Sequence, residues 1–477
     1  MKKLQGLLAM FLTLLMVIYM STGYASGAAI GLRSKTASGI LTTSASSELS
    51  VGAAKVKIPL PDNFFPYTSF RGRYFTGVHD DLYVRVITIG NKINASLLIS
   101  IDNGDVSDEW LPQISKLSGV PECNIYFAAT HTHEAPYIGS TFYETTLQDV
   151  EKSIAYKNNA WKALSEAVQT AKKNMQPAKI AFANGSCDIN VNRDYKYTGN
   201  QSEITAPYIT DPNPHGICDK TVAVMKFVDM SEKPIAYFIN YSIHSYVMYQ
   251  SKVKDNGMFI SGDIAGATSR YVEDRSPVNC VAMWTMACSA DTQPKYVSAY
   301  DVFDAQGNLK TVDSGAAGYV LLDEQAQELG TEVLRVGANM TNFTSKAALA
   351  GITKTITVPG QVKWDDNPAT LPKGYKYQDG PAVDLRLGLL LINNVAFVGI
   401  PGELVTSVGQ TLKKTMISLN CTDALVVTNC NGSVQYMSDD DGYKNQTFSA
   451  IASHCKAGVG NYIIKGESDM LKALKSE

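Results

Sequence analysis

The stretch Ile125-Tyr126-Phe127-Ala128-Ala129-Thr130-His131-Thr132-His133 sets the organisation of this chain. Its first five residues are apolar and predict a buried strand that reaches the surface at Thr130. Residues i and i+2 of an extended segment point to the same face, so His131 and His133 converge on one point in space. Paired imidazoles of this kind suit a metal ion or a polarised carbonyl, and they also occur as a satisfied surface pair.

The composition is that of an ordinary globular protein. The 477 residues are 45% hydrophobic and 18% charged, which allows a sizeable buried core. The net charge of -3 gives no reason to expect nucleic acid or an anionic membrane surface as a partner.

The N-terminus has the pattern of a signal peptide. Lys2 and Lys3 precede an apolar run over residues 7–20, and small residues follow from Ala25. The apolar run is shorter than the roughly 18–20 residues that a membrane span needs. We therefore expect residues 1–25 to be a signal peptide and the protein to be secreted or held in the cell envelope. An uncleaved signal anchor is the alternative.

The rest of the chain divides into a leader and one large domain. Residues 26–50 are rich in Ser, Ala, Thr and Gly and predict a flexible leader. Residues 51–477 contain no long linker, no internal repeat and no glycine-rich phosphate loop. We expect this range to be a single domain of the size of a catalytic domain.

Export would permit disulfides among the eight cysteines, although spacing does not fix their pairing. Cys280 and Cys288 flank the apolar run 281–284 and are expected to be small buried hydrophobes. The better disulfide candidates have polar or turn-forming neighbours: Cys123, Cys187, Cys218, Cys421, Cys430 and Cys455.

Strands and helices alternate from about residue 51. Two pairs of apolar runs are each joined by a short polar turn, which predicts a hairpin. The pairs are 83–89 with 95–101, and 387–392 with 395–400, the second joined by Asn393-Asn394. Single apolar runs predict five further strands, at 180–183, 221–228, 235–241, 281–286 and 425–428.

Helical periodicity predicts helices at 109–117, 147–175, 264–273, 321–336 and 404–417. In the longest of these, apolar residues at helical spacing predict one buried face: Val150, Ile154, Trp161, Leu164, Val168 and Ala171. The mixture of hairpins and strand–helix units predicts a mixed α/β (α+β) domain, with mixed sheets covered by helices, rather than a doubly wound nucleotide-binding fold.

Three further residues that can carry chemistry follow apolar runs. His244 lies just past the predicted strand 235–241, where it is either a site residue or an ordinary surface or core histidine. Glu403 follows a strand within a Pro-Gly turn, and it can also be a carboxylate in the first turn of the next helix, where the macrodipole favours it. Asp263 can cap the following helix or orient a ligand histidine through a hydrogen bond.

Two histidines and one carboxylate with an open fourth position are a common ligand set for catalytic zinc. Zinc lowers the pKa of bound water to about 7 and polarises a carbonyl, which together suffice for amide or ester hydrolysis. The residues alone therefore predict a secreted zinc hydrolase.

The chain also resembles the neutral (non-lysosomal) ceramidases, zinc amidases that cleave the acyl chain from ceramide. The resemblance follows the family's order of motifs through most of the chain. The matching residues are 77–85, the THTH motif 130–133, 191–193, His244 with Met248, 261–263, 401–403, and in part Tyr436-Met437-Ser438 with Tyr443 and Gln446.

The resemblance implies roles for particular residues. It implies Zn²⁺ bound by His131, His244, Glu403 and Tyr436, although a tyrosine would not be chosen from general zinc chemistry. It further implies that His133 faces the substrate beside the metal. Arg193 would contact the polar head of the substrate, and both residues suit stabilisation of an oxyanion.

The chain departs from the family pattern at three places. Gln293 stands where the family has a serine implicated in catalysis, and its amide cannot act as a nucleophile. Glu134 and Tyr137 replace small residues that follow the THTH motif, and we expect them at the mouth of the site. The C-terminal immunoglobulin-like domain of full-length ceramidases is expected to be absent.

The expected function is hydrolysis of the N-acyl bond of a ceramide-like lipid by attack of zinc-bound water, in sphingolipid metabolism. The expected partner is a lipid-like N-acyl small molecule, which implies transient contact with a membrane surface. Two alternatives stay open. One is a zinc-retaining binding protein of the same fold without catalysis, which Gln293 favours. The other is a zinc amidase or esterase for a different substrate, such as a cell-wall or peptide amide.

Overall fold

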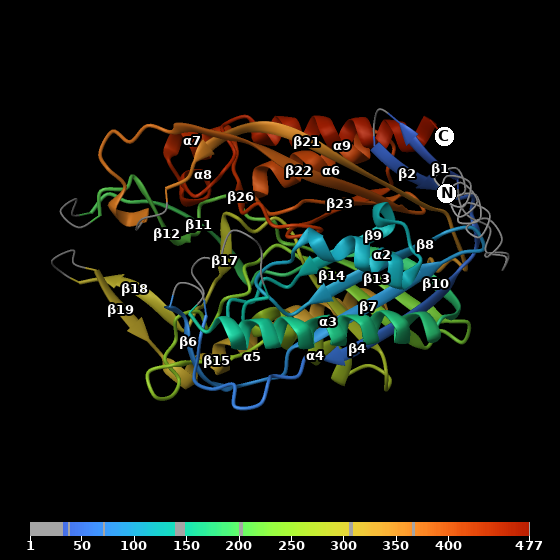
Figure 1. Cartoon of the computed structure of the whole chain (residues 1–477), viewed down its shortest axis with the longest axis horizontal. Coiled ribbons are helices and arrows are strands. Elements are labelled where there is room, and N and C mark those ends of the chain that lie inside the picture. Colours follow the sequence, from blue (N-terminus) through green and yellow to red (C-terminus); the bar gives the residue numbers. More distant parts are fainter. Residues whose placement is uncertain are drawn as a thin grey trace, which may run out of the picture. The chain divides into compact units, whose positions relative to one another are not determined.

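Two β-sheets packed face to face form the centre of the structure, a computed structural model that describes residues 32–36, 39–69, 72–138, 148–199, 204–304, 309–364 and 368–476 (Figure 1). The six-stranded sheet has the order β1 (Leu32–Thr36), β2 (Gly39–Thr43), β21 (Leu349–Val362), β22 (Gln378–Ile392), β23 (Val395–Gly399) and β25 (Asp423–Val427). The eight-stranded sheet has the order β16 (Val281–Met286), β14 (Pro234–Tyr241), β13 (Thr221–Asp229), β10 (Gln176–Ser186), β4 (Ser50–Lys57), β7 (Tyr83–Gly90), β8 (Ala95–Ile101) and β9 (Ile125–Ala129).

Apolar side chains from both sheets form the core between them. Ile87 and Phe238 of the eight-stranded sheet belong to the same buried cluster as Leu390 and Phe397 of the six-stranded sheet. The rings of Phe238 and Phe397 meet edge to face with centroids 5.2 Å apart. This continuous run of β-branched, aliphatic and aromatic side chains joins the two sheets into one sandwich.

Helices cover the outer face of each sheet. On the eight-stranded sheet, α2 (Leu111–Ser118) and α3 (Val150–Lys173) pack over β4, β7, β8 and β9. On the other part of that sheet, α4 (Asp263–Asp274) and α5 (Gly318–Ala338) cover β13, β14 and β16. The six-stranded sheet carries α6 (Thr406–Ser418) and α9 (Val459–Ser476), which lie along its outer side in Figure 1. The predicted mixed α/β fold with helix-covered mixed sheets is confirmed.

Both predicted hairpins are present. In the first, Gly90 of β7 pairs with Ala95 of β8. In the second, Ile392 of β22 pairs with Val395 of β23, and the turn residue Asn393 has a φ of 55°. Asparagine tolerates this left-handed conformation, which is why an Asn-Asn pair marks the turn.

The prediction of a flexible leader is wrong for the part of 26–50 that the structure describes. Strand β2 lies within this range and extends the six-stranded sheet, with Ile40 opposite Thr353 of β21. Leu41 of this strand is buried. Its Ser- and Thr-rich sequence gives little sign of a strand, because β2 joins the six-stranded sheet by pairing with residues more than 300 positions later. The predicted signal peptide, 1–25, lies outside the described residues.

Helix α3 buries a different face from the predicted one over its first turns. Val150 and Ile154 are 46% and 55% exposed, against expectation. The predicted burial of three residues later in the helix is confirmed: Leu164, Val168 and Ala171. Small side chains dominate the buried face because the sheet approaches closely, and a Cβ at Gly52 of β4 would lie 2.0 Å from the Ala171 carbonyl oxygen. Hydrophobicity alone does not reveal such a preference for alanine.

None of the six candidate cysteines forms a disulfide in the structure. All eight cysteines lie within the described residues and all are free thiols. Seven of them are buried, including Cys280 and Cys288 as expected. Most of these thiols therefore act as small apolar side chains in the core.

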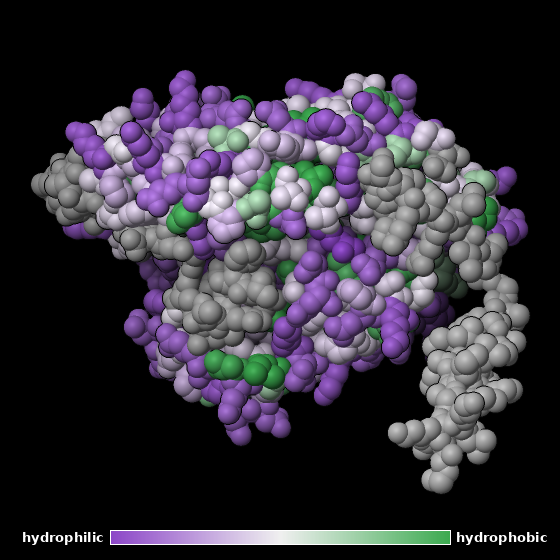
Figure 2. All heavy atoms as spheres, turned by 45° about the horizontal axis from the view of Figure 1, so that its top comes forward, coloured by the Kyte–Doolittle hydropathy of each residue, from purple (hydrophilic) through white to green (hydrophobic). Residues whose placement is uncertain are grey.

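None of the described helices is long and apolar enough to cross a membrane. The face shown in Figure 2 is largely hydrophilic, with apolar side chains gathered in small separate patches.

A lone carboxyl group lies in the apolar layer beneath α9. Glu467 is fully buried, and neither of its carboxyl oxygens has a hydrogen-bond partner among the described residues. Burial raises the pKa of Glu467 well above its usual value, so the folded protein keeps this proton. The unfolded chain releases it near pH 4.3. The buried Glu467 carboxyl therefore lowers the free energy of unfolding increasingly as the pH rises from acid to neutral.

We expect Glu467→Met to raise the free energy of unfolding by about 1–3 kcal/mol at neutral pH, because it removes an unsatisfied buried polar group. The gain over the wild type should shrink as the pH approaches about 4, where both states of the carboxyl are protonated. Denaturant unfolding at several pH values measures this. Glu467→Gln is the matched control that keeps a polar group but cannot titrate. A gain that does not depend on pH would contradict the assignment of a buried protonated carboxyl.

Candidate metal centre

Three functional side chains meet because each follows the end of a different strand. His131 comes directly after β9, His244 after β14, and Glu403 after β23. Each of these strands has a parallel partner in its sheet: β8, β16 and β25 respectively. Crevices at the carboxyl ends of such strands are the usual location of ligand sites in α/β folds. Segments more than 100 residues apart are thereby brought to one point.

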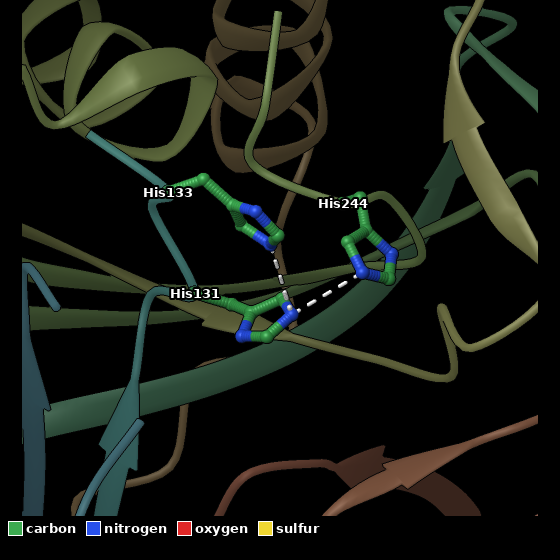
Figure 3. A group of neighbouring side chains, drawn as sticks. All are labelled: His131, His133 and His244. Carbon is green, nitrogen blue, oxygen red and sulfur yellow. Dashed lines mark hydrogen bonds between the residues drawn. The ribbon is translucent and has the colours of Figure 1, made fainter. Parts of the chain in front are cut away.

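The imidazoles of His131, His133 and His244 point toward one another (Figure 3). Nε2 of His131 lies 3.2 Å from Nε2 of His244 and 3.4 Å from Nε2 of His133. His131 and His244 are buried, and His133 is partly buried. The rings of His131 and His133 converge as predicted, although His131 has a left-handed φ of 62° and is not part of an extended segment.

Glu403 completes a set of electron-pair donors with two of these rings. One of its carboxylate oxygens lies 3.4 Å from Nε2 of His131, and the other lies 3.1 Å from Nε2 of His244. Although burial alone would raise it, interactions with the neighbouring imidazoles of His131 and His244 lower the pKa of Glu403 below its usual value. The carboxylate is therefore ionised and faces the two imidazoles.

The outward nitrogens of His131 and His244 face backbone carbonyl groups. Nδ1 of His131 lies 2.5 Å from the Gly104 oxygen, and Nδ1 of His244 lies 2.7 Å from the Ser289 oxygen. A carbonyl only accepts, so each Nδ1 carries a proton, and in the neutral ring each Nε2 presents a lone pair to the centre. The Asn429 amide also lies 2.9 Å from Nδ1 of His131 and, turned about its last bond, offers its oxygen as a second acceptor.

The pKa values of His244 and His131 are shifted in opposite directions. Burial, and then the positive charge of Arg193, lowers the pKa of His244 to about 3, so this ring is neutral. For His131, burial opposes the effect, but the negative charge of Glu403 raises the pKa above its usual value. A metal ion at the centre would compete with that proton for Nε2 of His131, which must be deprotonated to act as a ligand.

The spacing of these donors fits a metal ion. Zinc binds nitrogen at about 2.0–2.1 Å in tetrahedral geometry, which places neighbouring ligand atoms about 3.4 Å apart. The separations of 3.2, 3.1 and 3.4 Å among His131, His244 and Glu403 match the edges of such a tetrahedron. Two lone pairs and a carboxylate held this close also repel one another unless a cation lies between them.

The backbone around the centre is held in uncommon conformations. His131, Asn429 and Gln435 have φ angles of 62°, 45° and 64°, which are left-handed values that residues with a Cβ rarely adopt. The Glu403 amide donates to the Gln435 carbonyl at 2.8 Å, and a Cβ at Gly402 would lie 2.4 Å from the same oxygen. Such conformations cluster at functional sites, where surrounding contacts enforce them.

Tyr436 lies beside Glu403 in a short parallel ladder. Strand β24 (Glu403–Leu404) pairs with β26 (Tyr436–Met437), and Glu403 is directly opposite Tyr436. The pairing places Tyr436, from a segment that follows β25, next to Glu403. No feature of the sequence apart from the resemblance indicates this.

Arg193 and Gln293 are joined through Tyr246. The Arg193 guanidinium donates to the Ala290 carbonyl at 3.0 and 2.7 Å, and to the Tyr246 hydroxyl at 3.5 Å. That hydroxyl donates to the Gln293 amide oxygen at 2.9 Å. The ring of Tyr246 in turn meets His133 with centroids 5.5 Å apart. Both predicted residues therefore lie in the wall of the centre, and Gln293 has a partner of its own.

Asp263 accepts hydrogen bonds from backbone amides near the centre rather than from a histidine ring. Its carboxylate accepts from the amides of Val247 and Met248, both at 2.9 Å, and from Ile264 at 2.6 Å. It therefore fixes the turn that follows His244 and also begins α4. None of the hydrogen bonds of Asp263 among the described residues is to a histidine ring.

The sequence predicts Glu134 and Tyr137 at the mouth of the site, but neither lies there. Both are buried. Burial, and then the negative charge of Asp263 and a hydrogen bond with it, hold the pKa of Glu134 well above its usual value. Glu134 is therefore a protonated acid, and its backbone carbonyl accepts from the Ser261 amide at 3.1 Å, which links the THTH loop to the segment before α4.

Sequence reasoning missed Arg73 and Asn429. Arg73 reaches His133, with Nη2 3.3 Å from its Nδ1 and Nη1 3.2 Å from its carbonyl oxygen. Asn429 follows β25, so the rule that site residues lie past strand ends would have found it. Arg73 immediately precedes β6 (Tyr74–Val78) and carries no local signal.

The fold and the centre together define a layered α/β protein with a buried histidine–carboxylate cluster that can hold a metal ion. The chain matches the profile of the family described as neutral/alkaline non-lysosomal ceramidase, N-terminal, over residues 62–320. This match covers more than half of the chain, and the chain belongs to that family.

Relatives and solved structures agree with the family assignment. The chain is 24% identical to neutral ceramidase A of Dictyostelium discoideum over 272 residues, which are 54% of this chain and 36% of that protein. It is 28% identical to neutral ceramidase 1 of Arabidopsis thaliana over 161 residues, 32% of this chain and 18% of that protein. The matched part thus spans well under half the length of either relative.

Among solved structures, the fold is similar to one described as ceramidase complexed with C2, with a TM-score of 0.67 and 14% identity over 90% of this chain and 76% of the other. It is also similar to the neutral ceramidase of Pseudomonas aeruginosa, with a TM-score of 0.65 and 13% identity over 90% and 75% of the two chains. At such low identity these structures support the fold.

We expect the purified protein to bind about one zinc ion per chain, as a single tetrahedral centre would. His131→Ala and His244→Ala should each abolish this binding, because each removes one of the converging lone pairs. Metal analysis after dialysis measures it. His215→Ala, at an exposed histidine, is the matched control and should keep the metal. Zinc that persists in both site variants would contradict the assignment.

Proposed function

We propose that this protein is an exported zinc-dependent hydrolase that cleaves the N-acyl amide bond of a ceramide-like lipid. The observation that carries the proposal is the convergence of His131, His244 and Glu403 at the spacing of a tetrahedral metal site. Membership of the ceramidase family supports a hydrolase. The similar structure of a ceramidase complexed with C2 supports a lipid substrate, and the signal-peptide pattern of residues 1–25 supports export.

The proposed metal ligands are His131, His244, Glu403 and Tyr436. The donor atoms of His131, His244 and Glu403 lie at the separations of a tetrahedral metal site. Tyr436 is paired with Glu403 in the β24–β26 ladder. Zinc, when bound, lowers the pKa of water and polarises the carbonyl of the amide. The protein's own contribution is to hold the donor atoms in place before any ligand arrives.

His133 and Arg193 are proposed to stabilise the negative charge that develops on the amide oxygen. His133 turns its Nε2 toward the same centre, 3.4 Å from Nε2 of His131. Burial, followed by the positive charges of Arg73 and of the neighbouring groups, holds the pKa of His133 well below its usual value. A neutral ring can donate one hydrogen bond from Nε2 at no cost in charge repulsion. Arg193 adds a fixed positive charge in a buried wall.

A second candidate function is binding without catalysis, which Gln293 favours. Its amide oxygen is engaged by the Tyr246 hydroxyl, and an amide cannot supply a nucleophile. A protein of this kind would keep the metal and the fold and would not turn over an N-acyl lipid.

The two candidates differ in turnover. We expect the zinc-loaded protein to release fatty acid from an N-acyl sphingosine dispersed in detergent, and His131→Ala to abolish this release together with zinc binding. Assays on a peptide amide and on a simple ester of the same acyl chain then test the substrate class. Stoichiometric zinc with no hydrolysis of any of these substrates would support the binding protein and contradict the hydrolase.

Gln293→Ser tests the departure from the family pattern. We expect zinc content to stay unchanged, because Gln293 binds Tyr246 rather than a metal ligand, and N-acyl hydrolysis to rise. Gln293→Ala is the control that removes the amide without adding a hydroxyl. Equal losses of activity in both variants would show that the acceptor for Tyr246 matters more than a hydroxyl at this position.

A further inference from the structure

The three clustered histidines differ in what their outward nitrogens meet. Nδ1 of His131 and Nδ1 of His244 face carbonyl oxygens, which accept hydrogen bonds. Nδ1 of His133 instead lies 3.3 Å from Nη2 of Arg73. A guanidinium carries only hydrogen-bond donors and no acceptor.

This contact determines the tautomer of His133. Because Arg73 can only donate, Nδ1 of His133 must carry the lone pair and Nε2 must carry the proton. Two of the three rings thus present a lone pair to the centre, whereas His133 presents an N–H group. Its proton has an acceptor in the metal-free protein, since the Nε2 lone pair of His131 is 3.4 Å away.

Arg73 is well placed to hold this arrangement. A second donor, Nη1, reaches the His133 carbonyl oxygen at 3.2 Å, so the guanidinium contacts both the ring and the backbone of His133. The guanidinium also lies over the ring of Tyr249, 5.2 Å from its centroid. Tyr249 itself meets His133 edge to face at 5.0 Å. Arg73, Tyr249 and His133 therefore form one packed group beside the centre.

We infer that Arg73 is a positioning residue that fixes His133 as a hydrogen-bond donor to the substrate and keeps it out of the metal's ligand set. The inference rests on the proposed function of the centre and adds the reason why a cluster of three histidines would bind its ion through only two of them. Without the guanidinium, the ring of His133 is free to exchange its proton between the two nitrogens. It could then offer an Nε2 lone pair and become a third imidazole ligand.

The first test uses the metal-free protein with ¹⁵N-labelled histidine. In the wild type, we expect the His133 ring, assigned by its loss in His133→Ala, to show a proton on Nε2 and a bare Nδ1. In Arg73→Met, we expect the population with a proton on Nδ1 to grow. Arg73→Lys keeps a donor-only cation and should restore the wild-type tautomer at least in part. A wild-type ring protonated on Nδ1, or identical spectra in wild type and Arg73→Met, would overturn the inference.

The second test counts imidazoles on the metal by X-ray absorption of the zinc-loaded proteins. The inference predicts two imidazoles in the wild type and three in Arg73→Met. Three in the wild type would overturn it. If the wild type binds no zinc, the proposed function fails, and the tautomer measurement on the metal-free protein still decides the role of Arg73.

The third test is a double-mutant cycle on hydrolysis. Arg73→Met should lower kcat/KM by about 10-fold to 100-fold, since it misdirects a donor to the developing oxyanion. In a His133→Ala background the same change should cost almost nothing, because Arg73 acts through His133. Fully additive losses would show that Arg73 acts by another route.

Discussion

The candidate metal centre depends on electrostatic repulsion between donor atoms that the fold holds close together. Two imidazole lone pairs and an ionised carboxylate, from His131, His244 and Glu403, are held about 3 Å apart in a buried position. Backbone carbonyl groups behind the two rings fix their tautomers, so the lone pairs cannot turn away. Bringing like electron pairs together costs free energy unless a cation joins them. The rest of the sandwich supplies the rigidity that sustains this arrangement.

The layered architecture explains how such a cluster arises from distant segments. Two sheets share one apolar core, and the residues that follow the strands β9, β14 and β23 meet at one buried cluster. The left-handed residue His131 then turns its imidazole inward immediately after its strand. Because helices cover both outer faces, this edge of the sandwich remains for chemistry. Membership of the ceramidase family agrees with this use of the fold.

Sequence patterns predicted the parts of the protein that local chemistry determines. The hairpins, the principal strands and five helices follow from apolar periodicity and turn chemistry. The convergence of His131 and His133 was predicted from an extended segment, but the left-handed backbone of His131 in the loop after β9 produces it. Contacts over long distances were not accessible in this way. Strand β2 is held by a partner more than 300 residues later, and the alanine-rich face of α3 reflects a close approach of the sheet. Arg73 is linked to His133 only by tertiary contact, and Glu134 looked exposed because its partner Asp263 is distant in sequence.

The central claim is that one ion lies between His131, His244 and Glu403, with His133 beside it as a donor. Anomalous diffraction at the zinc edge from crystals of the zinc-loaded protein tests this most directly. The account predicts a single strong peak about 2.0–2.2 Å from Nε2 of His131, from Nε2 of His244 and from a Glu403 oxygen, with Nε2 of His133 beyond bonding distance. A peak bound by all three histidines without Glu403, or no peak in this crevice, would contradict it.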